Sequence, residues 1–227
     1  MGSDSVEQLG PLQTGPAWST IKLPIAARVI EDTGGAAALS SSTRDLVGRA
    51  ITASDNAAAA ELWDQLASAH GGPSGAASAV GELLAAAGDT QTTVSTVGRD
   101  GFSPYGQTEW SLVAQEHFVS ALAAGCVAPA AAGELRTLMG QVVPDQRWGL
   151  GTASSNASFK GGWGPGLDGR YLVRQVGVVE QDGGAIAVAI AAIPGDGQVA
   201  TGTAAVTSLA QWVVANTVWT KTKPTSC

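Results

Sequence analysis

The sequence predicts an α+β fold, in which an antiparallel sheet is packed with helices and a helical subdomain is attached. Up to about residue 140, apolar residues recur at helical spacing, as in Leu62 and Leu66, and glycine or proline clusters interrupt them. From Ser158 onward the pattern changes to short apolar runs joined by Gly/Asp turns. Because such turns connect antiparallel neighbours, the chain order is helices, then a meander of strands, then a last helix.

The first two thirds of the chain are predicted to be helical after a polar lead-in at residues 1–16. Thr108 is the expected cap of one helix, with Glu109 in its first turn. Residues 91–106 have no helical period and contain several glycines, so they form a long loop, an element that often carries function. Helices are expected at 18–31, 43–49, 57–69, 75–87, 108–124 and 129–139.

The last third is predicted to hold the sheet. Strands are expected at 158–162, 169–181 and 185–193, and a helix at about 203–216 follows them. With 227 residues the chain is long enough for one large domain. We expect that domain to span 17–227, with its helical part at about 35–140 and its sheet part at about 155–220.

Composition excludes several classes of partner. Twelve Lys and Arg residues against nineteen Asp and Glu residues give a net charge of −7, without a basic patch for nucleic acid. The longest apolar run, 185–194, is too short for a membrane span. His70 and His117 lack partners at metal-ligand spacing, so we expect both to be structural and expect no metal and no cofactor. A monomer is expected.

The chain has two cysteines, Cys126 and Cys227. Two free thiols are one interpretation. A disulfide is the other, since a cysteine pair in an exported protein tends to be oxidised. It would close a long loop and stabilise the fold by roughly 4 kcal/mol on the chain-entropy estimate.

Ser19 and Lys22 stand three residues apart in the segment Ala17–Pro24. At the start of a helix they would share one face, one turn apart. A hydroxyl beside an amine is the minimum for an activated nucleophile, because a partly buried amine loses its proton more easily and becomes a base. Taken alone, the pair is more typical of a helix cap followed by a solvated lysine, because a short motif without context is mostly a false positive.

Two further motifs follow in order. Ser54-Asp55-Asn56 precedes a predicted helix, where capping residues are common, and Lys160-Gly161-Gly162 ends the first predicted strand. Together, S-x-x-K, S-D-N and K-x-G are the three elements of the serine penicillin-recognising enzymes. The chain resembles the β-lactamase and DD-peptidase superfamily, most closely its class A-like members, over nearly all residues after 16. The resemblance implies a β-lactamase/transpeptidase-like fold.

The resemblance also implies roles. Ser19 would attack a carbonyl and become acylated, Lys22 would take its proton, and Ser54 would relay that proton to the leaving nitrogen. Asn56 would hold the amide side chain of the substrate. Lys160 would lower the pKa of Lys22 by like-charge repulsion and attract an anionic substrate.

The third motif and its flank would bind the substrate along the strand edge. The resemblance implies an oxyanion hole made of the backbone N–H groups of Ser19 and Trp163, worth about 3 kcal/mol per donor. The glycines Gly161, Gly162 and Gly164 would let the substrate lie beside the strand as an added strand. Trp163 would border the substrate.

Three departures from the family pattern are visible. Gly161 stands where a Thr or Ser hydroxyl usually helps to bind the carboxylate of the substrate. The loop 91–106 contains only Asp100 as an acid, and no E-x-x-x-N, although class A β-lactamases use a glutamate there to release the acyl group. Only eighteen residues precede Ser19, whereas the family's sheet begins with strands before the nucleophile. Either those N-terminal strands are missing from this chain, or the sheet is smaller at that edge.

The sequence therefore predicts a serine hydrolase that forms an acyl-enzyme at Ser19 on an amide or peptide, with weak or no β-lactamase turnover. A peptidoglycan-like or β-lactam compound is the expected partner. The alternatives are a catalytically inactive binding or sensor module of the cell envelope, and an esterase that uses the same Ser–Lys pair. Met1-Gly2-Ser3 is typical of an artificial start, so we expect a secreted or cell-envelope protein whose signal or anchor has been removed.

Overall fold

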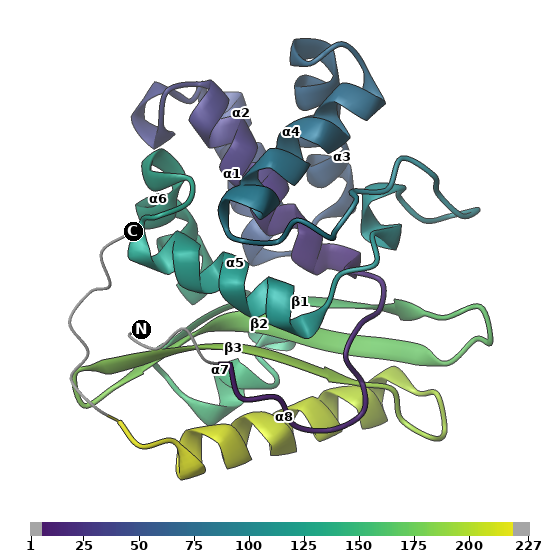
Figure 1. The fold of residues 1–227 in the computed structure, drawn as a ribbon, viewed down its shortest axis with the longest axis vertical. Helices are drawn as coiled ribbons and strands as arrows, with labels where there is room; N and C mark the ends of the chain where they lie inside the picture. Colours follow the sequence, from purple (N-terminus) through teal and green to yellow (C-terminus); the bar gives the residue numbers. More distant parts are fainter. Residues whose placement is uncertain (1–5, 220–227) are drawn as a thin grey trace.

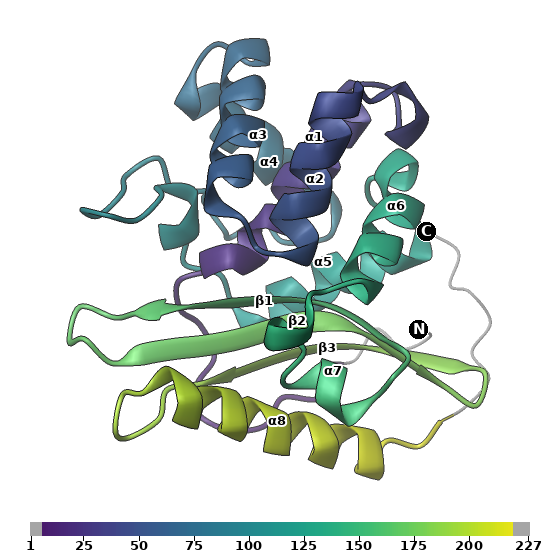
Figure 2. The ribbon, with the colours of Figure 1, turned by 180° about the vertical axis from the view of Figure 1, so that it is seen from behind.

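The computed structural model describes residues 6–219, and within them a three-stranded sheet lies between two layers of helices (Figure 1). The strands β1 (Ala157–Pro165), β2 (Tyr171–Gln181) and β3 (Gly184–Ala192) lie in the order β1-β2-β3, and both neighbouring pairs are antiparallel. Helix α8 (Val199–Asn216) packs on one face, together with the short α7 (Leu150–Ala153) (Figure 2). The other face is covered by α5 (Leu112–Ala124) and α6 (Pro129–Gly140).

The remaining helices form the predicted helical part of the fold on the α5 and α6 side of the sheet (Figure 1). They are α1 (Lys22–Asp32), α2 (Ser41–Thr52), α3 (Asn56–Ala69) and α4 (Pro73–Ala86). The predicted α+β architecture, with strands that meander after a run of helices, is confirmed for the part of the chain that the structure describes.

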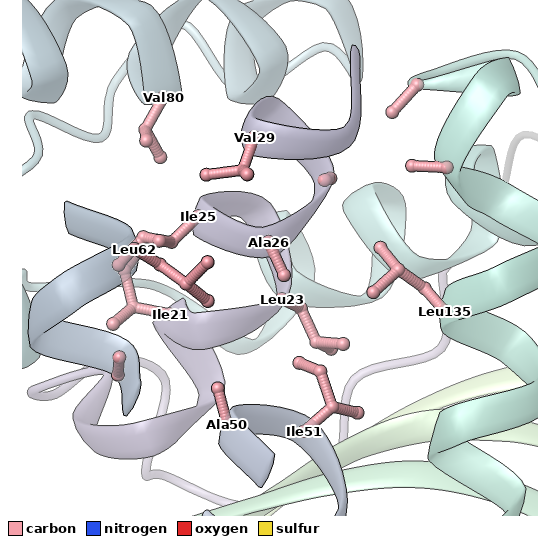
Figure 3. Packing of buried hydrophobic residues seen from close by; sticks show 14 of the residues in the cluster. Ile21, Leu23, Ile25, Ala26, Val29, Ala50, Ile51, Leu62, Val80 and Leu135 are labelled. Carbon is pink, nitrogen blue, oxygen red and sulfur yellow. The ribbon is translucent and has the colours of Figure 1, made fainter. Parts of the chain in front are cut away.

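Helix α1 lies at the centre of the hydrophobic core (Figure 3). Ile21, Leu23, Ile25 and Ala26 are fully buried, although they point in different directions around the helix. A helix that is apolar on all sides is stable only when other elements surround it. Helices α2, α3, α4 and α6 contribute the surrounding side chains, so the segment that carries Ser19 and Lys22 starts a rigid, enclosed element.

Several helices extend beyond their predicted ends for local reasons. Helix α2 begins at Ser41, because the hydroxyl of Ser40 accepts a hydrogen bond from Thr43 N and caps it. Helix α4 begins at Pro73, a residue that suits the first turn of a helix. The hairpin between β2 and β3 turns at Asp182 and Gly183, both with positive φ, as the Asp-Gly pattern predicts.

The predicted start of α5 at Thr108 is wrong. The helix begins at Leu112, and its cap is Ser111, whose hydroxyl accepts from Ala114 N. The preceding backbone is extended and bonds to the lead-in: Trp110 N donates to Gly15 O, and Ala17 N donates to Thr108 O. Because these groups already have partners outside a helix, the turn cannot wind earlier.

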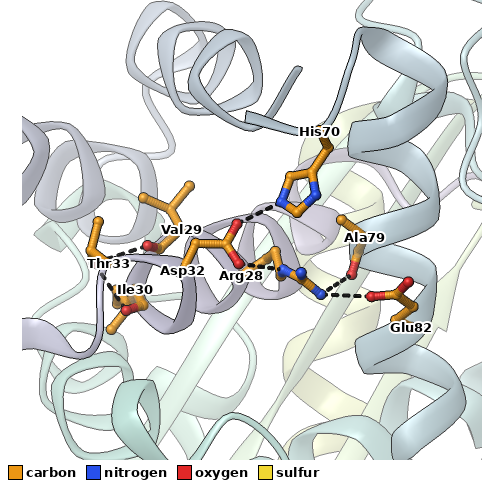
Figure 4. Close-up of polar contacts among 8 residues, drawn as sticks. All are labelled: Arg28, Val29, Ile30, Asp32, Thr33, His70, Ala79 and Glu82. Carbon is orange, nitrogen blue, oxygen red and sulfur yellow. Dashed lines mark hydrogen bonds and ion pairs between the residues drawn. The ribbon is translucent and has the colours of Figure 1, made fainter. Parts of the chain in front are cut away.

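A surface cluster of charges joins α1 to the helices beside it (Figure 4). Arg28 pairs with Asp32 at 2.8 Å and with Glu82 at 2.9 Å, and a ring nitrogen of His70 lies 2.7 Å from Asp32. His70 thus has a partner within the structural cluster, which fits the structural role predicted for it.

Two further sequence predictions concern single elements. Within residues 6–219, no single helix is long and apolar enough to cross a membrane. The pair α5 and α6 passes that test only jointly, with a bend of 105° between its members. Cys126 lies just beyond Gly125, which caps the end of α5, whereas Cys227 lies outside the described residues, so their disulfide stays a prediction.

Candidate active site

The segment around Ser19 changes from a tight turn to a helix. Trp18–Ile21 form one 3-10 turn, and α1 continues from Lys22, so a short turn precedes the predicted helix. Ser19 is partly exposed, whereas Lys22 keeps only 2% of its surface exposed. The nucleophile candidate is therefore accessible, and the amine that follows it is enclosed.

The amine of Lys22 is held by the second motif. Its Nζ donates to Ser54 O at 2.6 Å and to Asn56 Oδ1 at 2.7 Å, with a longer contact of 3.3 Å to Asp55 O. Burial lowers the pKa of Lys22 to about 7, and the negative charge of Asp55 opposes this shift. The resemblance implies that repulsion from Lys160 lowers the pKa of Lys22. In the structure, the main cause of the lowered pKa is burial.

Lys160 reaches the same motif from β1. Its Nζ lies 2.7 Å from Ser54 Oγ and 2.8 Å from Gly161 O, and only 1% of the residue is exposed. Burial, followed by repulsion from Lys22, lowers the pKa of Lys160. Since Ser54 Oγ accepts from Lys160, the hydroxyl keeps its own proton to donate elsewhere. The three motifs, distant in the sequence, therefore meet at Ser54.

The first motif packs directly on the third, because β1 carries glycine where the two backbones meet. A Cβ built on Gly162 would lie 2.9 Å from Ser19 N and 3.0 Å from Ala17 O. Such distances are too short for any side chain, so Gly162 is what allows the Ser19 turn to lie against the strand. Gly164 meets the ring of Trp18 in the same way.

Two residues of the site have unusual backbone angles. Trp18, directly before Ser19, has φ 48°, and Ser54 has φ 57°. Residues other than glycine rarely adopt these left-handed backbone angles. Residues under such backbone strain are often found at functional sites. Both lie at positions that the motifs single out.

A buried polar network beneath Ser19 was not predicted as such. Arg174, on β2, is 1% exposed and donates to Gly15 O, Pro16 O, Trp110 O and Gln115 Oε1. Gln115 Nε2 donates in turn to the hydroxyl of Thr20, which donates to Ala17 O at 2.6 Å.

This network fixes the Ser19 turn from below. The guanidinium of Arg174 is bound by the protein's own carbonyl groups and is not directed at a substrate. The sequence signal for this network was the pair Arg174-Gln175 within a largely apolar strand. A charged side chain is buried only where other groups pair with it, so such a pair indicates a buried polar network.

The loop 91–106 lies against the other side of the Ser19 turn. The guanidinium of Arg99 stacks on the rings of Trp18 and Phe102, with 5.4 Å and 4.8 Å to their centroids. It also donates to Gln107 Oε1 and to Pro165 O at the end of β1. The long loop predicted from the sequence is therefore attached to both the first and the third motif.

The acids near this loop have other surroundings than the family pattern requires. Asp100, the one acid of the loop, is exposed. Glu109 is exposed too, and its backbone pairs with Pro16 in an isolated bridge, so it does not open a helix.

Solved structures were compared with this fold. The chromosome-encoded β-lactamase of Vibrio parahaemolyticus superposes with a TM-score of 0.69 at 14% sequence identity, over 89% of this chain and 84% of that one. The β-lactamase of Sphaerobacter thermophilus gives a TM-score of 0.65 at 19% identity, over 89% and 83%. PBP-A gives 0.63 at 18% identity, over 89% and 81%.

No protein-family model matches the sequence, and no curated protein does either. The TM-scores establish a common fold, and identities of 14–19% leave activity open. The fold, the chain coverage and the order of elements agree with the expectation drawn from the three motifs. The chain therefore has the fold of the serine β-lactamase and penicillin-binding protein superfamily.

Proposed function

We propose that this chain is a serine hydrolase that forms an acyl-enzyme at Ser19 on an amide or ester. The observation that carries the proposal is the enclosed Lys22, whose amine contacts two residues of the second motif and whose pKa is lowered to about 7. At neutral pH about half of such amines are free bases. A lysine in that state is able to accept the proton of a nearby hydroxyl.

The reaction would begin when Ser19 Oγ attacks the carbonyl carbon and its proton passes to Lys22 Nζ. Ser54, held by Lys160, would carry a proton to the leaving atom as the carbonyl bond to that atom breaks. Asn56 Oδ1 accepts a hydrogen bond from Lys22, so the amide N–H groups of Asn56 remain to donate to the substrate. The N–H groups of Ser19 and Trp163 are the proposed donors to the oxyanion.

Release of the acyl group is proposed to be slow. Asp100 and Glu109, the acids within and just beyond the loop 91–106, are both exposed, so neither is enclosed in the site as a base for the attacking water. We propose weak or no β-lactamase turnover, and a secreted or cell-envelope setting with a peptidoglycan-like substrate.

Covalent labelling tests the proposal. The wild type, Ser19→Ala and Ser208→Ala are incubated with an alkyl fluorophosphonate, and the intact mass of each is measured. Ser208 lies on the exposed face of α8 and serves as a matched serine control. One adduct is expected on the wild type and on Ser208→Ala, and none on Ser19→Ala.

Labelling of Ser19→Ala at the wild-type rate would refute the assignment of the nucleophile. An unlabelled wild type with a normal unfolding transition would favour the inactive binding module. Incubation with benzylpenicillin then reports on release, because a stable adduct means acylation without turnover, whereas consumption without an adduct would contradict slow release.

A further inference from the structure

The face of β1 that points away from the Ser19 turn carries an aromatic surface. Alternate residues of a strand share a face, so Gly161 and Trp163 lie together, opposite Lys160 and Gly162. The ring of Trp148 lies beside Gly161: a Cβ built on that glycine would be 3.1 Å from Trp148 and 3.7 Å from Trp163. The two tryptophans contact each other edge to face, with centroids 5.9 Å apart.

Trp148 is fixed in this place by a buried glutamine. Gln175 pairs with Gly161 across β1 and β2 and is 0% exposed. Its Nε2 donates to Trp148 O at 2.7 Å, and its Oε1 accepts from Leu150 N at 2.8 Å. Both ends of the amide thus hold the turn that carries the ring of Trp148. The position of the ring is therefore fixed by buried hydrogen bonds.

The arginines nearest in sequence are directed elsewhere. Arg147 donates to Gly140 O and lies over the ring of Phe159, two residues before Gly161. Arg170 pairs with Asp168 in the exposed turn. With Arg174 buried under the Ser19 turn, each of these three guanidinium groups has protein partners other than Trp148 and Trp163.

We infer that Trp148 and Trp163 bind an uncharged, apolar group of the substrate, at the place where a Thr or Ser hydroxyl would otherwise contact a carboxylate. The site then takes neutral esters or amides in preference to substrates with a free carboxylate there. Gly161 is the residue that permits this, since a Cβ at 161 would lie 3.1 Å from the ring of Trp148, which would have to shift by a few tenths of an ångström. The inference rests on the acyl-enzyme function proposed above.

Benzylpenicillin and its methyl ester test the inference, because esterification of that carboxyl group removes its charge and adds only a methyl group. The rate of acylation of Ser19 is followed by intact mass for each compound. For the wild type we expect the ester to react at least about tenfold faster, since an unpaired carboxylate would lose its water against two rings.

Variants assign the preference to the rings. Trp148→Ala is expected to slow the ester roughly tenfold and to leave the acid unchanged, and Trp148→Phe, which keeps a ring, to stay within about threefold of the wild type. Trp148→Arg is expected to raise the ratio of acid to ester rates, because it places a cation beside Gly161. Trp212→Ala removes a half-exposed tryptophan of α8 and should change neither rate.

Faster acylation by the acid in the wild type would overturn the inference. If Arg99→Gln then removed that advantage, the carboxylate would be assigned to Arg99 instead. Reaction with neither compound, while the fluorophosphonate still labels Ser19, would also overturn the inference and leave the proposed function standing. Failure of the fluorophosphonate itself would refute the function.

Discussion

The rate at which Ser19 is acylated should follow the protonation of Lys22. An amine with the ordinary pKa of 10.5 is neutral in about one molecule in 3,000 at pH 7, whereas one with a pKa of about 7 is neutral in about half. Burial of Lys22 therefore increases the reactive fraction by about a thousandfold. At pH 5 only about one molecule in a hundred would be neutral, so acylation should fall about fiftyfold from its value at pH 7.

The assay is the second-order rate of labelling by the fluorophosphonate between pH 5 and pH 9, read by intact mass and corrected for hydrolysis of the reagent in buffer. The rate should rise tenfold per pH unit below an inflection at about 7 and be level above it. A rate that is independent of pH, or that still rises beyond pH 9, would refute the role of Lys22 as the base.

A single substitution should move that inflection in a known direction. Asp55 raises the pKa of Lys22 through its charge, and its side chain also caps α3 by accepting from Ala57 N and Ala58 N. Asp55→Asn removes the charge but keeps an oxygen for the cap, so the inflection should shift to lower pH. Asp45→Asn is the matched control, because Asp45 also pairs with Arg49, and it should leave the inflection in place.

Three further predictions concern stability and packing. Arg174→Met leaves Pro16 O, Trp110 O and Gln115 Oε1 without this donor, whereas Gly15 O still accepts from Trp110 N, and it should cost about 3–5 kcal/mol, a fall in Tm of roughly 6–20 °C by calorimetry. Gly162→Ala should abolish labelling of the nucleophile and lower the Tm, because its Cβ meets main-chain atoms of the Ser19 turn, whereas Gly48→Ala has open space and should not. Lys22→Met should be more stable than the wild type at pH 6 in urea unfolding. The pKa of Lys22 is about 7 in the folded protein and 10.5 in the unfolded chain, so between these pH values the unfolded chain binds more protons. The free energy of unfolding of the wild type therefore rises with pH over this range. The difference in stability between Lys22→Met and the wild type should close by pH 10.

The sequence predicts those features of this molecule that depend on local chemistry. The periods of apolar residues locate the helices and strands, and the Asp182-Gly183 turn sets the hairpin. The meeting of Lys22, Ser54 and Lys160 follows from motif order, since residues with a shared chemical task must converge even when more than a hundred positions separate them.

Features that depend on long-range pairing could not be predicted. Thr108 has the side chain of a helix cap, but its backbone is already bonded to the lead-in, so α5 starts three residues beyond Glu109. The partners of Arg174 come from the lead-in, from the segment before α5 and from α5 itself, and no sequence period links them. The position of Trp148 beside Gly161 likewise depends on Gln175, a residue of a different strand.

The enclosure of α1 has a consequence for how this protein could acquire new specificities. Ile21 and Leu23 flank Lys22 and, with Ile25, fill the core, so a change near the nucleophile also changes folding stability. Heritable variation is better tolerated at the partly exposed Trp148 turn and at exposed positions of the loop 91–106, such as Val97 and Asp100, which are less enclosed than α1. Adaptation to another substrate is therefore expected to proceed through those two segments, while the segment from Ser19 to Ile25 stays fixed among descendants.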